Sequence, residues 1–166
     1  MITPAYCRTM AAYNTEMNRR FYAAAATLDD AARRRPCGAF FGSLHGTLCH
    51  LVWGDTMWMS RFDGGTPPPV KLPESPRMIE DFATLRTTRE ALDARIESWA
   101  AGIEQPALDG DLTWFSGAAG REVRRSMSLL VMHFFNHQTH HRGQAHALLT
   151  AAGASTGDTD LFLVLP

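Results

Sequence analysis

The segment Met132–Leu149 reads MHFFNHQTHHRGQAHALL and holds five of the chain's seven histidines. Its apolar residues recur at helical spacing, so one face of a helix would be apolar. Gly143 interrupts the pattern, but a helix tolerates an internal glycine at a cost of about 1 kcal/mol. The pattern predicts one long helix from about Arg125 to about Ala152.

The histidines of this segment are arranged along the predicted helix in a column. Side chains four residues apart lie on the same helical face, so His133, His137 and His141 stand one turn above another. His140 lies at the edge of that face, and His146 points away from it. His137 and His141 fall inside the apolar stripe, where we expect side chains to be buried.

Two interpretations of this buried pair remain open from the spacing alone. A buried imidazole without a partner costs a few kcal/mol, so each ring needs a hydrogen bond or a metal. The H-x3-H spacing of His137 and His141 suits two ligands of one ion, and it equally suits hydrogen-bonded core or interface histidines. A metal site would need a further ligand from a facing helix.

Composition restricts the class of protein. The chain has 166 residues, which predicts one domain over residues 1–166. Its 17 acidic and 16 basic residues give a net charge of -1, so we expect no nucleic-acid partner. We expect no signal peptide and no membrane span. The three cysteines, Cys7, Cys37 and Cys49, are widely spaced, which favours reduced thiols in the cytoplasm.

Two further helices are predicted before the connector. Residues from Pro4 to Thr27 have helical spacing, and Thr3 is a plausible cap. The stretch Phe40–Phe62, with Ser43 as its cap, is apolar on nearly all sides, which is typical of a central, buried helix. This second helix also carries His45, His50 and Asp55, so it needs polar partners nearby.

The middle of the chain predicts a connector, a helix and a hairpin. The Pro-rich segment Thr66–Pro76 is expected to be extended. An amphipathic helix follows over Ile79–Ala101, to which we assign no chemistry. Strand-like residues 112–115 and 122–124 flank a turn at Gly117–Gly120. Four long helices and a short hairpin predict an all-α, four-helix bundle, and such bundles build metal sites from facing helices.

Two segments together resemble the DinB family over essentially the whole chain. They are GSLHGTLCHLVWGDTMWMSRF at residues 42–62 and HFFNHQTHHRGQAHALL at residues 133–149. The resemblance implies an antiparallel four-helix bundle, often a homodimer. It also implies a divalent metal, zinc or nickel, held by His50, His137 and His141.

Three histidine ligands leave a coordination position for water or substrate, which is typical of a catalytic site. Some relatives use a low-molecular-weight thiol, so the resemblance implies a thiol transferase acting on a small-molecule substrate. The alternatives are a hydrolase, with Asp55, His45 or His140 moving protons, or a non-catalytic stress-response module. Asp55 and Gln144 are candidates for supporting the ligands, and Arg142 for meeting an anionic substrate. Each of these also fits a structural role.

The tail predicts a contact with another surface. Residues Leu161–Leu165 are apolar, and the chain has four Trp, nine Phe and eight Met. Exposed apolar patches usually mark interfaces, so we expect a homodimer. The alternative is that the tail covers the end of its own bundle.

Overall fold

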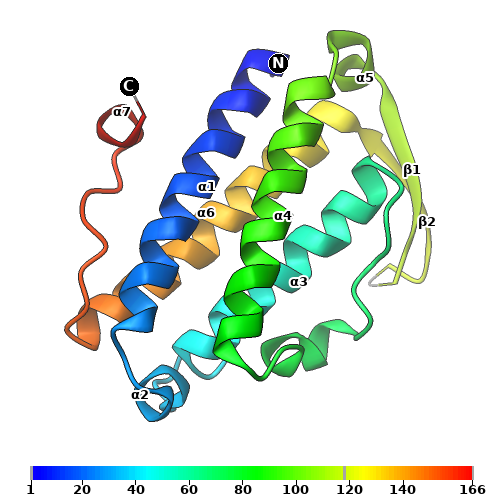
Figure 1. The fold of residues 1–166 in the computed structure, drawn as a ribbon. Helices are drawn as coiled ribbons and strands as arrows, with labels where there is room; N and C mark the ends of the chain where they lie inside the picture. The colour runs from blue at the N-terminus through cyan, green and yellow to red at the C-terminus, as the bar shows by residue number, and fades with distance from the viewer. Residues whose placement is uncertain (1, 118, 166) are drawn as a thin grey trace.

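Four long helices lie side by side in the computed structural model, which describes residues 2–117 and 119–165 (Figure 1). They are α1 (Pro4–Ala26), α3 (Leu44–Phe62), α4 (Phe82–Gly102) and α6 (Met127–Ala151). Helix α1 packs against α4 and α6, and α3 packs against the same two helices. The predicted four-helix bundle is confirmed.

The helices run in two opposite directions. Figure 1 shows α1 and α6 running one way and α3 and α4 running the other. The antiparallel pairs are therefore α1 with α4 and α3 with α6, and the long connection after α3 returns the chain to the end where α4 begins. In consequence, the beginning of α3 lies beside the end of α6.

Shorter elements join the long helices. They are α2 (Asp30–Arg34), the 3-10 helix η1 (Leu72–Arg77), α5 (Gln105–Asp109), β1 (Asp111–Ser116), β2 (Arg121–Ser126) and α7 (Leu161–Val164). The predicted hairpin is confirmed, with Trp114 opposite Val123 in an antiparallel pair, and both strands are longer than predicted. Ala118, in the predicted turn, lies outside the described residues.

Caps decide where the helices begin. The Thr3 and Ser43 hydroxyls each accept a hydrogen bond from a backbone N–H three residues ahead, at 3.2 and 3.1 Å, as predicted. The predicted start of the third helix at Ile79 is wrong. Asp81 accepts from the Thr84 N–H at 2.7 Å, and this cap begins α4 at Phe82.

Two other predictions are also wrong, one about a helix boundary and one about the conformation of the connector. Arg125 does not begin the last helix, because it pairs with Leu112 in the hairpin, and α6 begins only at Met127. The connector is not extended throughout, because its second part forms η1. Trp53 on α3 donates its indole N–H to the carbonyl of Val70 at 2.8 Å, which holds this connector against the bundle.

A polar network lies inside the apolar core and includes α4, the helix to which we assigned no chemistry. The Arg89 guanidinium donates to Asp55 on α3 at 2.6 Å and pairs with Asp93 at 2.8 Å. Asn18 on α1 donates to Asp93 at 2.9 Å. All four side chains are at most 5% exposed. The network therefore joins three of the four helices.

A second set of buried polar side chains joins α6 to α1. Arg142 donates to the amide oxygen of Asn14, and Asn14 donates to the amide oxygen of Gln138. Burial lowers the pKa of Arg142 to about 10, so its guanidinium is still charged at neutral pH. Among the described residues, the buried core thus holds two guanidinium groups, Arg89 and Arg142, and two carboxyl groups, Asp55 and Asp93.

The network predicts a large effect of the substitution Arg89→Met. It would leave Asp55 and Asp93 buried without their cation, so we expect a loss of about 3–5 kcal/mol in the free energy of unfolding. Urea denaturation measures this loss. Arg86→Met is the control, because Arg86 is exposed on the same helix and pairs only with Glu90 in the described structure, at 3.0 Å. Equal losses in the two variants would contradict a central role for Arg89.

Candidate metal centre

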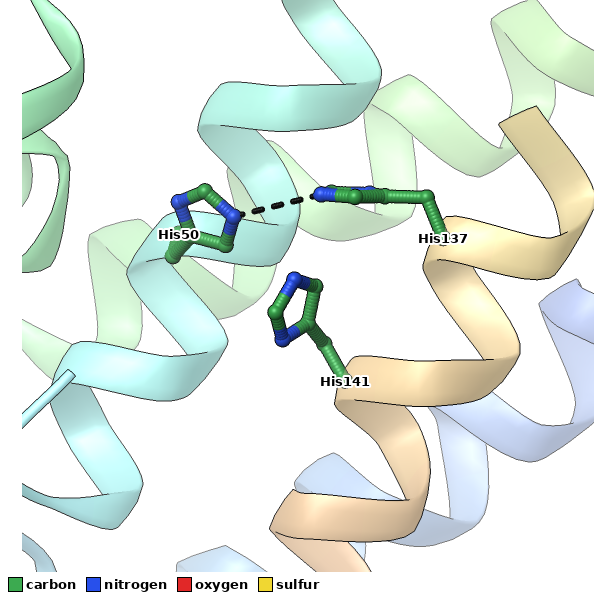
Figure 2. A group of neighbouring side chains, drawn as sticks. All are labelled: His50, His137 and His141. Carbon is green, nitrogen blue, oxygen red and sulfur yellow. Dashed lines mark hydrogen bonds between the residues drawn. The ribbon is translucent and has the colours of Figure 1, made fainter. Parts of the chain in front are cut away.

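Three histidines from α3 and α6 lie together. One ring nitrogen from each of His50, His137 and His141 lies within 4.8 Å of the others. Figure 2 shows His50 on one helix facing His137 and His141 on the other, and the Nε2 atoms of His50 and His137 are 3.3 Å apart. His50 and His141 are buried, and His137 is half-buried. These are the three residues that the family resemblance names as ligands.

The other histidines lie outside this cluster. His133 continues the column along α6, and its ring centroid lies 5.0 Å from that of Trp58. His140 is exposed, and the ring of His146 packs against that of Phe21 with their centroids 5.8 Å apart. His45 is buried near the start of α3, where its Nε2 lies 2.8 Å from the carbonyl oxygen of Ile79.

Hydrogen bonds at the Nδ1 atoms orient two of the three imidazole rings. The Nδ1–H of His141 donates to the amide oxygen of Gln144 at 2.8 Å, which leaves Nε2 of that ring free to bind a ligand. The Nδ1 atom of His50 lies 3.0 Å from the hydroxyl of Ser75, a buried residue of η1. Gln144 therefore supports the cluster, which was one of its two predicted roles. Ser75 was not predicted.

Burial keeps the three histidines of the cluster neutral at physiological pH. Burial, together with a smaller effect of the neighbouring imidazoles, lowers the pKa of His50 to about 3 and that of His137 to about 4. Burial also lowers the pKa of His141. Within the described residues, the buried Nδ1 of His137 has no hydrogen-bond partner. Unprotonated nitrogens with unmet bonding capacity fit a metal ion, which binds only neutral imidazole.

Close packing fixes where two of the rings lie. A Cβ atom at Gly54 would lie 2.7 Å from Cε1 of His137, so the ring occupies space that only glycine leaves free. The Phe41 ring stacks on His50 with centroids 3.7 Å apart and an interplanar angle of 18°. Phe41 can approach because Gly46 has no side chain to meet its carbonyl oxygen. Gly54 lies in the middle of a predicted buried helix, and this was the sequence signal that could have indicated the close packing of His137.

The cluster faces a cleft of about 300 Å³. The cleft is lined by Phe40, Phe41, His50, Trp53, Gly54, Met57, Trp58, Arg61, Leu72, His133, His137 and His141. None of these described lining residues carries a carboxyl group. Asp55 and Arg142 instead lie in the buried network, bonded to Arg89 and Asn14. Of the alternatives open for these two residues, the structure supports the structural roles.

The fold and the cluster together define a class: a helical-bundle protein with a buried three-histidine centre that could bind a metal. Three neutral imidazoles are a donor set for zinc and similar divalent ions. The family model described as "DinB family" matches residues 1–165, so the chain belongs to the DinB family. A comparison with curated proteins and another with solved structures found no match. Among the helices described, none has the length and apolar character needed to cross a bilayer.

The contact between Gly54 and His137 predicts the effect of Gly54→Ala. The added methyl group would displace the His137 ring, so we expect affinity for zinc to fall by about 10- to 100-fold. Competition with a chromophoric chelator measures this affinity. Gly143→Ala is the matched control, since a Cβ at this helical glycine meets no atom within 4 Å. Zinc affinity equal to wild type in Gly54→Ala would show that the ring position is unimportant.

Proposed function

We propose that this DinB family protein is a metal-dependent enzyme that activates a small thiol for transfer to an electrophile. His50, His137 and His141 hold a divalent ion, zinc or nickel. The observation that carries the proposal is that the three neutral imidazoles converge on an open cleft, whereas a structural zinc site is closed by its protein ligands. A small molecule can therefore reach the donor atoms.

The ion, when bound, supplies positive charge that lowers the pKa of a thiol placed next to it. The protein supplies the position and the surroundings. Ser75 and Gln144 orient two of the imidazoles, and Gly54 leaves room for the third. The aromatic rings of Phe41 and Trp53 stack near His50, with centroids 3.7 and 5.7 Å from its ring centroid.

The hydrolase alternative receives less support. Activating water requires a group that takes a proton near the reacting position. Asp55 is bonded to Arg89, and His45 lies next to the Ile79 carbonyl, so neither is available in the cleft. His140 is exposed and does not line the cleft, so His133, which does, would have to serve. A thiol beside the ion would release its proton to solvent water, so its transfer needs no base within the cleft, and this favours the transferase.

The proposal predicts that metal content and thiol chemistry fail together. We expect about one metal ion per chain, with content greatly reduced in His50→Ala and His137→Ala. Addition of a thiol to a generic electrophile should be lost in the chelated protein and in His141→Ala, while circular dichroism shows the helices intact. His146→Ala is the control, because this histidine of the same helix packs against Phe21, outside the cluster. Full activity in the chelated protein would rule out the mechanism.

We also propose that the protein is a homodimer. Phe162 and Leu163 of α7 are 76% and 58% exposed, so this short helix presents an apolar face to solvent. The preceding tail is held on its own bundle, since the Tyr13 hydroxyl donates to the carbonyl of Thr159 at 2.5 Å. A fixed support and an exposed apolar face together favour a contact with a second copy.

The dimer is tested by light scattering at micromolar concentration. We expect twice the chain mass for the wild type and the chain mass for the double variant Phe162→Ser, Leu163→Ser. The substitutions remove apolar area from α7 without touching the core, so thermal stability of the folded monomer should change little. A wild-type protein that scatters as a single chain would refute the proposal.

A further inference from the structure

Arg61 lines the same cleft as the histidine cluster, and nothing in the proposed chemistry uses it. It lies in the last turn of α3 and is half-buried. Its Cζ atom lies 4.5 Å from the ring centroid of Trp58 and 5.5 Å from that of Trp114, so the guanidinium group is held over aromatic rings.

The charge of Arg61 has no partner of opposite sign in the part of the chain that the structure describes. None of the ion pairs there includes it, and the nearby carboxylate of Asp63 is bonded to Arg95 by two contacts of 2.6 and 2.7 Å. Among the described lining residues of the cleft, Arg61 is the one guanidinium and no carboxyl group accompanies it. A half-buried cation without a counter-ion is a ready site for an anionic ligand.

A continuous aromatic wall connects the cluster to this cation. The ring centroids of His137 and His133 are 6.0 Å apart, those of His133 and Trp58 are 5.0 Å apart, and Arg61 covers Trp58. Met57 and Leu72 add apolar surface to the same cleft. The cleft thus offers metal-ligand nitrogens at one end, an apolar middle and a positive charge at the other end.

We propose that this cleft selects thiols that carry a carboxylate, with the sulfur at the histidine cluster, an apolar segment on Trp58, and the carboxylate on Arg61. This inference rests on the proposed function, because the sulfur end requires a bound metal. Arg61 is the residue that determines specificity: it binds the far end of the ligand and leaves the metal ligands untouched. The planar guanidinium suits a carboxylate, which it can bind with two parallel hydrogen bonds.

Ligand binding to the cobalt-substituted protein tests the inference without measuring turnover. The probes are ω-mercaptohexanoate and its uncharged methyl ester, and the readout is the sulfur-to-cobalt charge-transfer band. We expect wild type to bind the carboxylate about 10-fold more tightly than the ester, as one charge-assisted contact of about 1.4 kcal/mol gives. In Arg61→Met this preference should vanish while affinity for the ester is kept, and Arg61→Lys should restore part of it.

Two controls separate Arg61 from general effects. Arg86→Met removes an exposed charge on α4 that does not line the cleft, and it should keep the full preference for the carboxylate. Mercaptoacetate has a much shorter chain, so we expect it not to reach Arg61, and Arg61→Met should not change its affinity. An equal preference for carboxylate over ester in wild type and Arg61→Met would overturn the inference.

The inference and the proposed function can fail separately. If neither thiol perturbs the cobalt spectrum, the proposed function fails, and the carboxylate site is then tested in the metal-free protein. Hexanoate should quench the tryptophan fluorescence of wild type and not of Arg61→Met, because Trp58 and Trp114 lie under the guanidinium, while hexanol should act equally on both. Identical responses to hexanoate in the two proteins would overturn the carboxylate site.

Discussion

Asp55 and Asp93 share the positive charge of Arg89 inside the bundle, and this constraint sets how α3 lies against α4. A carboxylate left alone in such a core would cost several kcal/mol, so a displaced α3 would lose more than its apolar packing. The same helix carries His50 and Gly54. By fixing α3, the buried ion pairs therefore also fix two residues that the candidate metal centre requires.

Adjacent residues of helix α6 face two different surroundings, the buried core and the cleft. His137 is followed by Gln138, and His141 by Arg142, so two columns run along the helix about 100° apart. The histidine column reaches the cleft, while Gln138 and Arg142 face Asn14 inside the bundle. The buried hydrogen bonds of one column hold the rotation of α6, and this rotation aims the imidazoles of the other column at His50.

Much of the fold could be predicted from the sequence because helical periodicity and caps are local signals. The four helices, the hairpin and the caps at Thr3 and Ser43 followed from them. The H-x3-H pair identified two histidines of the cluster, but His50 came from the family resemblance and not from spacing. Spacing within one helix cannot say which residue of another helix will face it.

The parts that escaped prediction depend on contacts between distant segments. Ser75 belonged to the connector that was predicted to be extended, and Arg89 to a helix to which no chemistry was assigned, yet both are buried. Phe41 precedes α3, and its ring stacks on His50 because the backbone of Phe41 can lie close to Gly46. Burial of a polar residue is decided by its partner, and a single sequence does not name the partner.

The contact between Ser75 and His50 has a consequence for the connector between α3 and α4. Ser75 belongs to η1, so the connector touches the back of a ring whose front faces the cleft. Thermodynamic coupling between two sites is reciprocal. If the connector strengthens ligand binding at the histidines, a bound ligand stabilises the connector against local opening by the same free energy. Occupancy of the candidate centre would therefore be felt at the opposite side of His50, by a segment that contributes no donor atom to the cluster.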